Sequence, residues 1–252
     1  MHRNPNIIIA DKPVSLTSKD FADQIKQINN FKKVCFCGRL DPMARGKMLF
    51  LANEMCKEMD KNQNYDKTYQ FEIFLGIKTD SDDPLGIIED INFNNIEENK
   101  NKLIREIKLL CKNYPITINQ EFHKFSSIRV DGQPLWLHSK NDKKVKKPKH
   151  IVNIKKLEIF DNLKIKKIEF IDNIINIISN INKKHDFRQN NIIENWKKFN
   201  DDFQIEFLNS IKIELKVSSG FYVRQFVRDL SEKIQFPLMV FDINRINIDL
   251  SN

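Results

Sequence analysis

One carboxylate in this chain, that of Asp41, lies between two glycines in a segment built to turn. The proline that follows it fixes its own φ and pushes Asp41 towards an extended backbone. Asp is common in turns for local hydrogen-bonding reasons alone, so Asp41 is either a turn-former or a reactive group. A reactive carboxylate acts as a nucleophile or as a general base. The whole segment reads Gly38, Arg39, Leu40, Asp41, Pro42, Met43, Ala44, Arg45 and Gly46.

Tyr69 and Arg224 are two side chains suited to a site around such a carboxylate. Alternating apolar residues predict a strand over residues 67–76, with Tyr69 on its apolar face. That ring is either a core residue or a platform on which a base stacks. Residues 223–230 have the apolar spacing of a helix, and Arg224 lies off its apolar face. Its planar, permanently charged fork could bind the Asp41 carboxylate through two hydrogen bonds.

Four segments, in this order along the chain, resemble motifs of the TruB family of tRNA pseudouridine synthases. The run around Asp41 is similar to the catalytic motif of that family. Phe36 and Arg39 stand where the family usually has His and Thr, and the string Gly-Arg-Leu-Asp resembles the ribosomal-RNA branches of the superfamily. Residues 12–18 and 120–136 are also similar to family segments. The other three motifs lie at residues 67–76, 79–86 and 217–230.

The resemblance implies an α+β (mixed α/β) fold with a largely antiparallel central sheet flanked by helices and loops. It implies an isomerase that converts uridine in RNA to pseudouridine, at the T-loop uridine of tRNA (conventional position 55). The target base must leave its stack, and Asp41 would act at the ribose as nucleophile or as base. Arg39 could pair with Asp41 or with a phosphate. The side chains expected to support Asp41 are Tyr69, Arg224, Ile243 and Arg39.

Two alternatives stay open at the level of sequence. The chain could be a pseudouridine synthase for another RNA, such as a ribosomal, messenger or guide-directed site. It could also be a non-catalytic RNA-binding or RNA-folding helper on the same scaffold. Asp41, Tyr69 and Arg224 occur together, which argues against the helper, because binding alone needs only a basic surface. The implied reaction uses no cofactor, and the acids of residues 80–83 lack the spacing of a calcium-binding loop, so we expect no metal.

The charge of the chain favours a polyanionic partner. Its formal net charge is +8, which suits RNA and most simply tRNA. Residues 143–149 form a dense basic run, which is either a solvated loop or a track for phosphates. His123 has no partner nearby in sequence, so we expect no catalytic role for it. The side chains expected to bind RNA are Lys12, Lys67, Arg129, Lys146, Lys147 and Lys149.

The remaining patterns predict the elements that position these side chains. Thr17 and Ser18 can cap a helix that continues to about residue 28. Residues 42–59 are apolar at helical spacing, so we expect a helix whose N-terminus lies just after Asp41. Residues 172–200, rich in Asn, Ile and Lys, are interpreted as an insertion with little functional information. Other expected elements are strands at 6–10, 165–171, 203–217 and 240–248, and a helix at 94–112.

The length of 252 residues suits a single catalytic domain over residues 1–252, with no room for the C-terminal PUA domain that TruB enzymes normally have. No run of 18 or more apolar residues exists, so we expect no transmembrane helix and no membrane partner. The N-terminus lacks a signal peptide, and four scattered Cys do not make a disulfide framework. We expect an intracellular monomer, most simply in the cytoplasm, and a nuclear or organellar location stays open.

Overall fold

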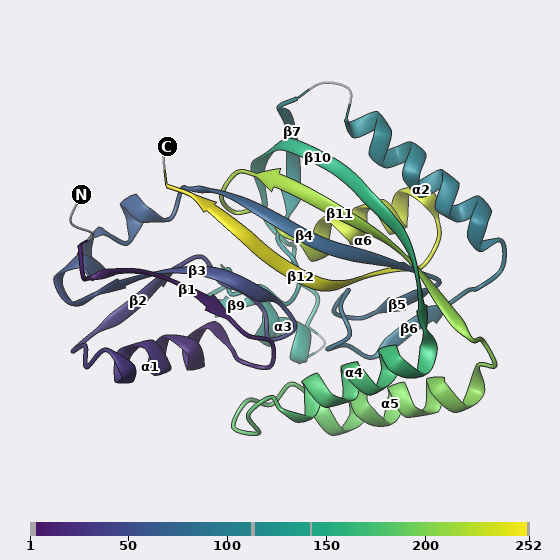
Figure 1. Cartoon of the computed structure of the whole chain (residues 1–252), viewed down its shortest axis with the longest axis horizontal. Helices are drawn as coiled ribbons and strands as arrows, with labels where there is room; N and C mark the ends of the chain where they lie inside the picture. Colours follow the sequence, from purple (N-terminus) through teal and green to yellow (C-terminus); the bar gives the residue numbers. More distant parts are fainter. Residues whose placement is uncertain (1–3, 112–113, 142, 251–252) are drawn as a thin grey trace.

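The fold is a mixed α/β arrangement around one large, mostly antiparallel sheet, as the sequence predicts (Figure 1). The computed structural model describes residues 4–111, 114–141 and 143–250. The sheet has eight strands in the order β1-β3-β12-β4-β11-β10-β7, and β2 pairs with β3. The pair of β12 with β3 is parallel and the other pairs are antiparallel. The strands are β1 (Ile7–Lys12), β2 (Val34–Cys37), β3 (Arg45–Ala52), β4 (Asp66–Leu75), β7 (Ile116–Glu121), β10 (Lys149–Lys166), β11 (Phe207–Val217) and β12 (Leu238–Asp249).

Helices cover both faces of this sheet. Alternation along β4 sends Phe71 and Ile73 into one apolar cluster and Phe74 into another on the opposite side. The first cluster contains residues of α1, α2 and α6, and the second contains residues of α4 and α5. The helices are α1 (Ser18–Ile28), α2 (Ile96–Leu110), α3 (Leu135–Lys140), α4 (Lys167–Ser179), α5 (Gln189–Asp202) and α6 (Val223–Ile234). Two short hairpins (β5 Ile77–Thr79 with β6 Ile88–Ile91, β8 Arg129–Val130 with β9 Gln133–Pro134) and 3-10 turns at Asn53–Glu58 and Asp60–Asn62 complete the fold.

Several predicted elements are confirmed. Thr17 caps α1, since its side chain accepts a hydrogen bond from the Asp20 backbone N–H. The strand predicted at 67–76 is β4, the final strand is β12, and α6 begins just after Tyr222. In the part of the chain that the structure describes, no helix is long and apolar enough to cross a membrane.

The helix predicted at residues 42–59 is wrong. These residues form a turn, then β3 and a 3-10 helix, so no helix N-terminus follows Asp41. Residues 48–52 are buried one after another, as in a strand covered on both faces, and such a run also satisfies helical spacing. Gly46 has a φ of +107°, outside the helical region.

The strand predicted at residues 165–171 is also wrong, because β10 ends at Lys166 and α4 begins at the next residue. Residues 172–200, interpreted as an insertion, fold into most of α4 and α5. These two helices bury Ile174, Ile178 and Trp196 completely against the sheet. The stretch is therefore an ordered helical hairpin that covers one face of the sheet.

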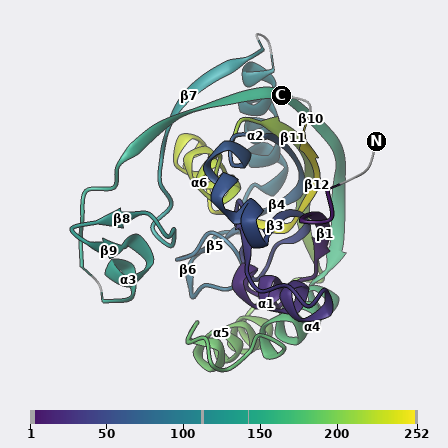
Figure 2. The same ribbon diagram turned by 90° about the vertical axis from the view of Figure 1, so that its left-hand side faces the viewer.

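One segment projects from the body between β7 and β10. These neighbouring strands are joined by residues 122–141 and 143–148, which contain β8, β9 and α3 and are called the arm below. Figure 2 shows the arm to one side of the sheet, above the level of α5. The basic run expected to bind RNA lies where the arm returns to β10.

Candidate active site

The loop that presents Asp41 is held by two buried side chains, those of Ser18 and Arg245. The Ser18 hydroxyl donates to the Leu40 carbonyl and accepts from the Leu40 N–H, both at 2.8 Å. The guanidinium of Arg245, itself only 1% exposed, donates to the carbonyls of Lys47, Arg39 and Gly38. Hydrogen bonds to the backbone leave the loop few alternative conformations, so they hold the backbone that carries Asp41.

Asp41 and Arg224 form the ion pair that the sequence predicts. Arg224 Nη2 lies 2.9 Å from Asp41 Oδ2, and the Asp41 side chain is 41% exposed whereas that of Arg224 is 7% exposed. Arg224 Nη1 also lies 3.6 Å from Asp83 Oδ2 and donates to the Ser81 carbonyl at 3.2 Å. Burial opposes the charge of Arg224, but Asp41 and Asp83 raise its pKa above the ordinary value. Arg224 thus links a carboxylate at the surface to one in the interior.

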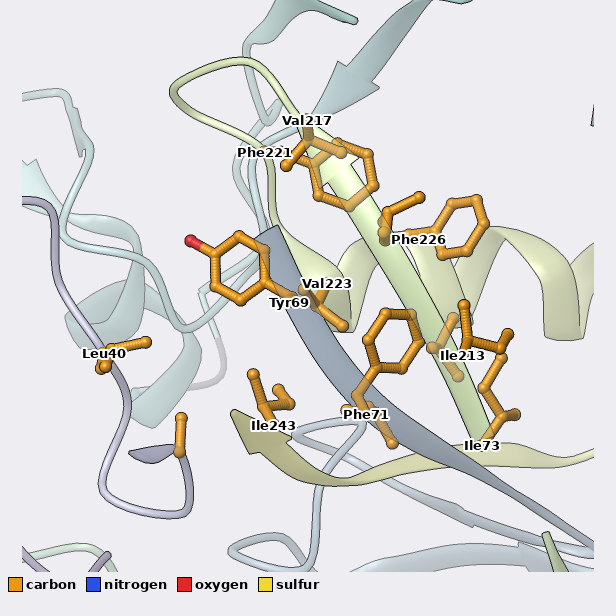
Figure 3. Packing of buried hydrophobic residues seen from close by; sticks show 14 of the residues in the cluster. Leu40, Tyr69, Phe71, Ile73, Ile213, Val217, Phe221, Val223, Phe226 and Ile243 are labelled. Atoms are coloured by element: carbon orange, nitrogen blue, oxygen red, sulfur yellow. The ribbon is translucent and has the colours of Figure 1, made fainter. Parts of the chain in front are cut away.

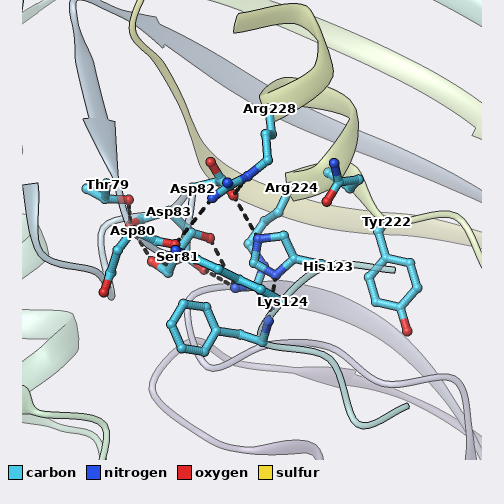
Figure 4. Close-up of polar contacts among 12 residues, drawn as sticks. Thr79, Asp80, Ser81, Asp82, Asp83, His123, Lys124, Tyr222, Arg224 and Arg228 are labelled. Atoms are coloured by element: carbon cyan, nitrogen blue, oxygen red, sulfur yellow. Dashed lines mark hydrogen bonds and ion pairs between the residues drawn. The ribbon is translucent and has the colours of Figure 1, made fainter. Parts of the chain in front are cut away.

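A buried polar cluster behind Arg224 was not predicted. The His123 ring is fully buried, and its Nε2 lies 2.8 Å from Asp82 Oδ2, to which Arg228 Nε donates at 2.7 Å (Figure 4). Burial raises the pKa of Asp82 and lowers that of His123 well below its usual range. Arg224 and Arg228 are four residues apart and share one face of α6, which is the one sequence signal that pointed here.

The loop of residues 79–86 takes its shape from its own polar groups, as expected. Thr79 and Ser81 hydroxyls donate to the Asp83 carbonyl, and Asp83 Oδ1 accepts from Ser81 Oγ and the Leu85 N–H. Burial raises the pKa of Asp83 to about 6, while Arg224 acts in the opposite direction. We call residues 79–86 the acid loop. Among the described residues, no group of three or more metal-ligating side chains is placed to hold a metal ion.

The residue that precedes Asp41 belongs to an apolar cluster that also holds Tyr69 and Ile243. Leu40, Tyr69 and Ile243 are 6%, 7% and 7% exposed and belong to one cluster. Figure 3 shows the Tyr69 ring extending from β4 towards the side on which the Leu40 loop lies, with Ile243 beside it. Tyr222 lies close by, and burial and then the charge of Asp41 raise its pKa. The predicted residues Tyr69 and Ile243 therefore lie in the same apolar cluster as Leu40, the neighbour of Asp41 in sequence.

A bulge in β12 aims Ile243 into this region. The pairing of β12 with β4 shifts between Phe241 and Asn244, and Asp242 has a φ of 46°. A bulge of this kind redirects a side chain and bends its strand. Arg45 fixes the bulge through two hydrogen bonds of 2.8 Å to the Asp242 carboxylate. Sequence periodicity does not reveal such a shift.

The predicted role of Lys12 and Lys67 needs correction. Both were expected to bind RNA, but they are 1% and 5% exposed. Lys12 donates to the Pro13 and Leu16 carbonyls, and Lys67 donates to the Gln63 and Tyr65 carbonyls. Burial lowers the pKa of Lys12 to about 7 and that of Lys67 to about 8. These ammonium groups face backbone oxygens and leave no exposed charge for a phosphate.

The remaining predicted cations lie nearer the surface. Arg39 lies over the ring of Phe36 at 5.2 Å, and in the described part of the chain the ion pair of Asp41 is with Arg224 instead. Arg129 is exposed on β8 and donates to the Gly132 carbonyl. In the basic run, Lys146 is exposed, whereas Lys147 and Lys149 lie 2.7 and 3.8 Å from the carboxylate of Glu121.

Comparison with known proteins identifies the family of this chain. Residues 26–172 match the model of the TruB family pseudouridylate synthase N-terminal domain. A protein named tRNA pseudouridine synthase B from Ureaplasma urealyticum serovar 10 is 30% identical over 233 residues, which cover 92% of this chain and 80% of that protein. A protein of the same name from Endomicrobium trichonymphae is 25% identical over 246 residues, covering 97% and 85% of the two chains.

The fold matches a solved structure described as a Cbf5-Nop10-Gar1 complex. The TM-score is 0.53 with 13% identity, over 96% of this chain and 48% of that chain, so this chain spans about half of its length. At that identity the match shows a shared fold. Together, the family model and the relatives agree with the motifs around Asp41, Tyr69 and Arg224, and the chain belongs to the TruB family of pseudouridylate synthases.

Proposed function

We propose that this chain isomerises uridine in RNA to pseudouridine, and that its substrate is the T-loop uridine of tRNA at conventional position 55. The relatives are named for tRNA, and the chain has the positive charge that an RNA partner requires. The observation that supports the activity most directly is the pair of a half-exposed Asp41 with a buried Arg224. A scaffold that only bound RNA would have no need of that pair.

In the proposed reaction, the bond between uracil N1 and ribose C1′ breaks, the base turns, and a bond forms between C5 and C1′. The proton of C5 is lost and N1 gains one, so the product is an isomer of the substrate. Asp41 acts at the ribose, either by attacking C1′ or by removing the C2′ proton so that a glycal forms. Both routes need a carboxylate aimed at the ribose, and the ion pair with Arg224 orients that of Asp41.

The target nucleotide must leave its stack to reach Asp41. Leu40, Tyr69 and Ile243 offer an apolar surface next to the carboxylate, and the Tyr69 ring can stack on the uracil. The detached base then stays against this surface while it turns. The exposed side of Asp41 is where the ribose would approach.

Tritium release tests this proposal. Unmodified tRNA transcript labelled with tritium at uridine C5 should lose its label with the wild-type chain and keep it with Asp41→Asn, which retains shape but loses the charge. The variant should bind the transcript with nearly unchanged affinity, because Asp41 contributes no positive charge. Asp23→Asn is a matched control, since Asp23 is an exposed carboxylate on α1 that pairs with Lys19.

The outcomes of the tritium-release assay separate the proposed function from its alternatives. Release that depends on Asp41, followed by mapping of the product to position 55, supports the whole proposal. Release from ribosomal or messenger transcripts but not from tRNA would overturn the substrate. Turnover by Asp41→Asn at the wild-type rate would overturn the mechanism, and tight binding without release from any RNA would leave a non-catalytic RNA-binding protein.

A further inference from the structure

The tip of the α4–α5 hairpin, residues 180–188, touches three segments that surround the active site. Lys184 Nζ and His185 Nε2 lie 2.5 and 2.7 Å from the Asp20 carboxylate, at the start of α1. Lys140, on α3 of the arm, lies 2.5 Å from Asp186. The third contact is made by Arg188, to the acid loop. In Figure 1 the tip lies at the end of the hairpin that is nearest α1.

Arg188 connects the acid loop to the base of the arm. Its Nη1 lies 2.7 Å from Asp80 Oδ2, and its guanidinium lies over the Phe125 ring, 5.8 Å from the centroid. A guanidinium can bind a carboxylate and lie over an aromatic face at the same time. The position follows the part of the chain that matches the family model, which ends at residue 172.

The backbone at Arg188 is held in an uncommon conformation. Its φ of 62° and ψ of 30° lie in the left-handed region, which is unfavourable for a residue other than glycine. Arg188 is also the residue that precedes α5, and the Ile192 N–H donates to its carbonyl. Such strain persists where surrounding contacts fix the residue. Here those contacts are Asp80 and Phe125.

Both partners of Arg188 lie next to the buried polar cluster. Asp80 Oδ1 accepts from the Ile87 N–H, and its carbonyl lies 3.4 Å from Arg228 Nη2. Phe125 follows His123 by two residues, and their ring centroids are 6.0 Å apart. Fixing Asp80 and Phe125 together therefore fixes the start of the arm relative to the loop that binds Arg224.

We propose that Arg188 is a positioning residue that sets the arm against the acid loop before RNA binds. This inference rests on the proposed function, because it takes RNA as the substrate that the arm meets. An arm that is already in place loses less conformational freedom when RNA binds. Arg188 therefore lowers KM and changes kcat little. The hairpin thereby serves the site as well as the core.

Arg188→Gln should raise KM for tRNA about tenfold, the range expected when a charged hydrogen bond and a cation–π contact are lost, and change kcat less than twofold. Arg188→Lys, which keeps the charge beside Asp80, should recover part of the loss. Phe125→Leu should raise KM as well. The variant with both Arg188→Gln and Phe125→Leu should raise KM by less than the two single effects combined. Lys184→Gln, from the same tip but paired with Asp20, is the matched control.

Trypsin cleavage of the free protein gives a readout that does not need activity. Arg188→Gln should speed cleavage in the basic run, at residues 143–149, at an unchanged melting temperature. Unchanged cleavage together with unchanged KM would overturn the inference. If no RNA is converted by the wild type but Arg188→Gln still frees the arm, the proposed function fails while the positioning role stands. A fall in kcat alone, with KM unchanged, would also overturn it.

Discussion

At the scale of single residues, Arg224 is the side chain on which the site depends. It has carboxylates on both sides, Asp41 at the surface and Asp83 in the interior, and it also donates to the Ser81 carbonyl. Only a planar guanidinium can meet all three acceptors, because its donors point in fixed directions from one group. The Asp41 carboxylate is therefore aimed by the same residue that neutralises the buried Asp83.

Arg224→Lys tests this geometry. A lysine keeps one positive charge but cannot span Asp41 and Asp83, so Asp41 should shift from its place. We expect kcat to fall about a hundredfold, the loss that a 1 Å misplacement can cause, with little change in the Kd for tRNA. Single-turnover kinetics and a binding titration would measure the two quantities. A variant with wild-type kcat would show that the charge alone suffices.

Lys12 predicts how stability depends on pH. Burial lowers its pKa from 10.5 to about 7, with Asp41 acting in the opposite direction. Between these two values the unfolded chain binds a proton that the folded chain does not, so the free energy of unfolding rises with pH, by at most about 1.4 kcal/mol per pH unit. Urea unfolding from pH 7 to 9.5 should show a smaller rise for Lys12→Met than for the wild type. Parallel curves would contradict this, and the exposed Lys19→Met is the control.

At the scale of elements, the sequence predicted those whose pattern is local. The Thr17 cap defines α1, strict alternation defines β4, and apolar spacing after Tyr222 defines α6. It failed for β3, because an unbroken apolar run fits a helix as well as a strand buried on both faces. Only pairing with β1 and β12, which are distant in sequence, decides between the two.

In the site, too, the residues in local motifs were predicted and the long-range contacts were not. Asp41, Tyr69, Arg224 and Ile243 lie in recognisable motifs, and the structure brings them together. The Asp82 pair with His123 was not predicted, because 41 residues separate the two and neither lies in a periodic pattern. The burial of Trp196 and the contacts of Arg188 were likewise not predicted, because the composition of residues 172–200, rich in Asn, was interpreted as that of an insertion. Long-range contacts of this kind follow from tertiary packing rather than from local sequence.

At the scale of the whole molecule, the net charge of +8 predicts that RNA binding weakens with salt. The contribution of each lysine depends on whether the protein already neutralises it. Lys146 is exposed, whereas Lys147 lies 2.7 Å from the Glu121 carboxylate. A lysine that must first leave a carboxylate contributes less to the release of counterions from RNA. Two neighbouring residues in the basic run should therefore behave differently.

Lys146→Gln should reduce the slope of log Kd against log salt by about 0.7 to 0.9, the value for one phosphate contact. Lys147→Gln should reduce it by clearly less, and Glu121→Gln, which frees Lys147, should steepen the slope. Binding titrations on one tRNA at four salt concentrations would measure all three. Lys57→Gln is the control, since Lys57 is exposed and pairs with Glu54 in the 3-10 turn. Equal slopes for Lys146→Gln and the wild type would mean that the basic run lies outside the RNA footprint, and the arm would then meet RNA through other residues.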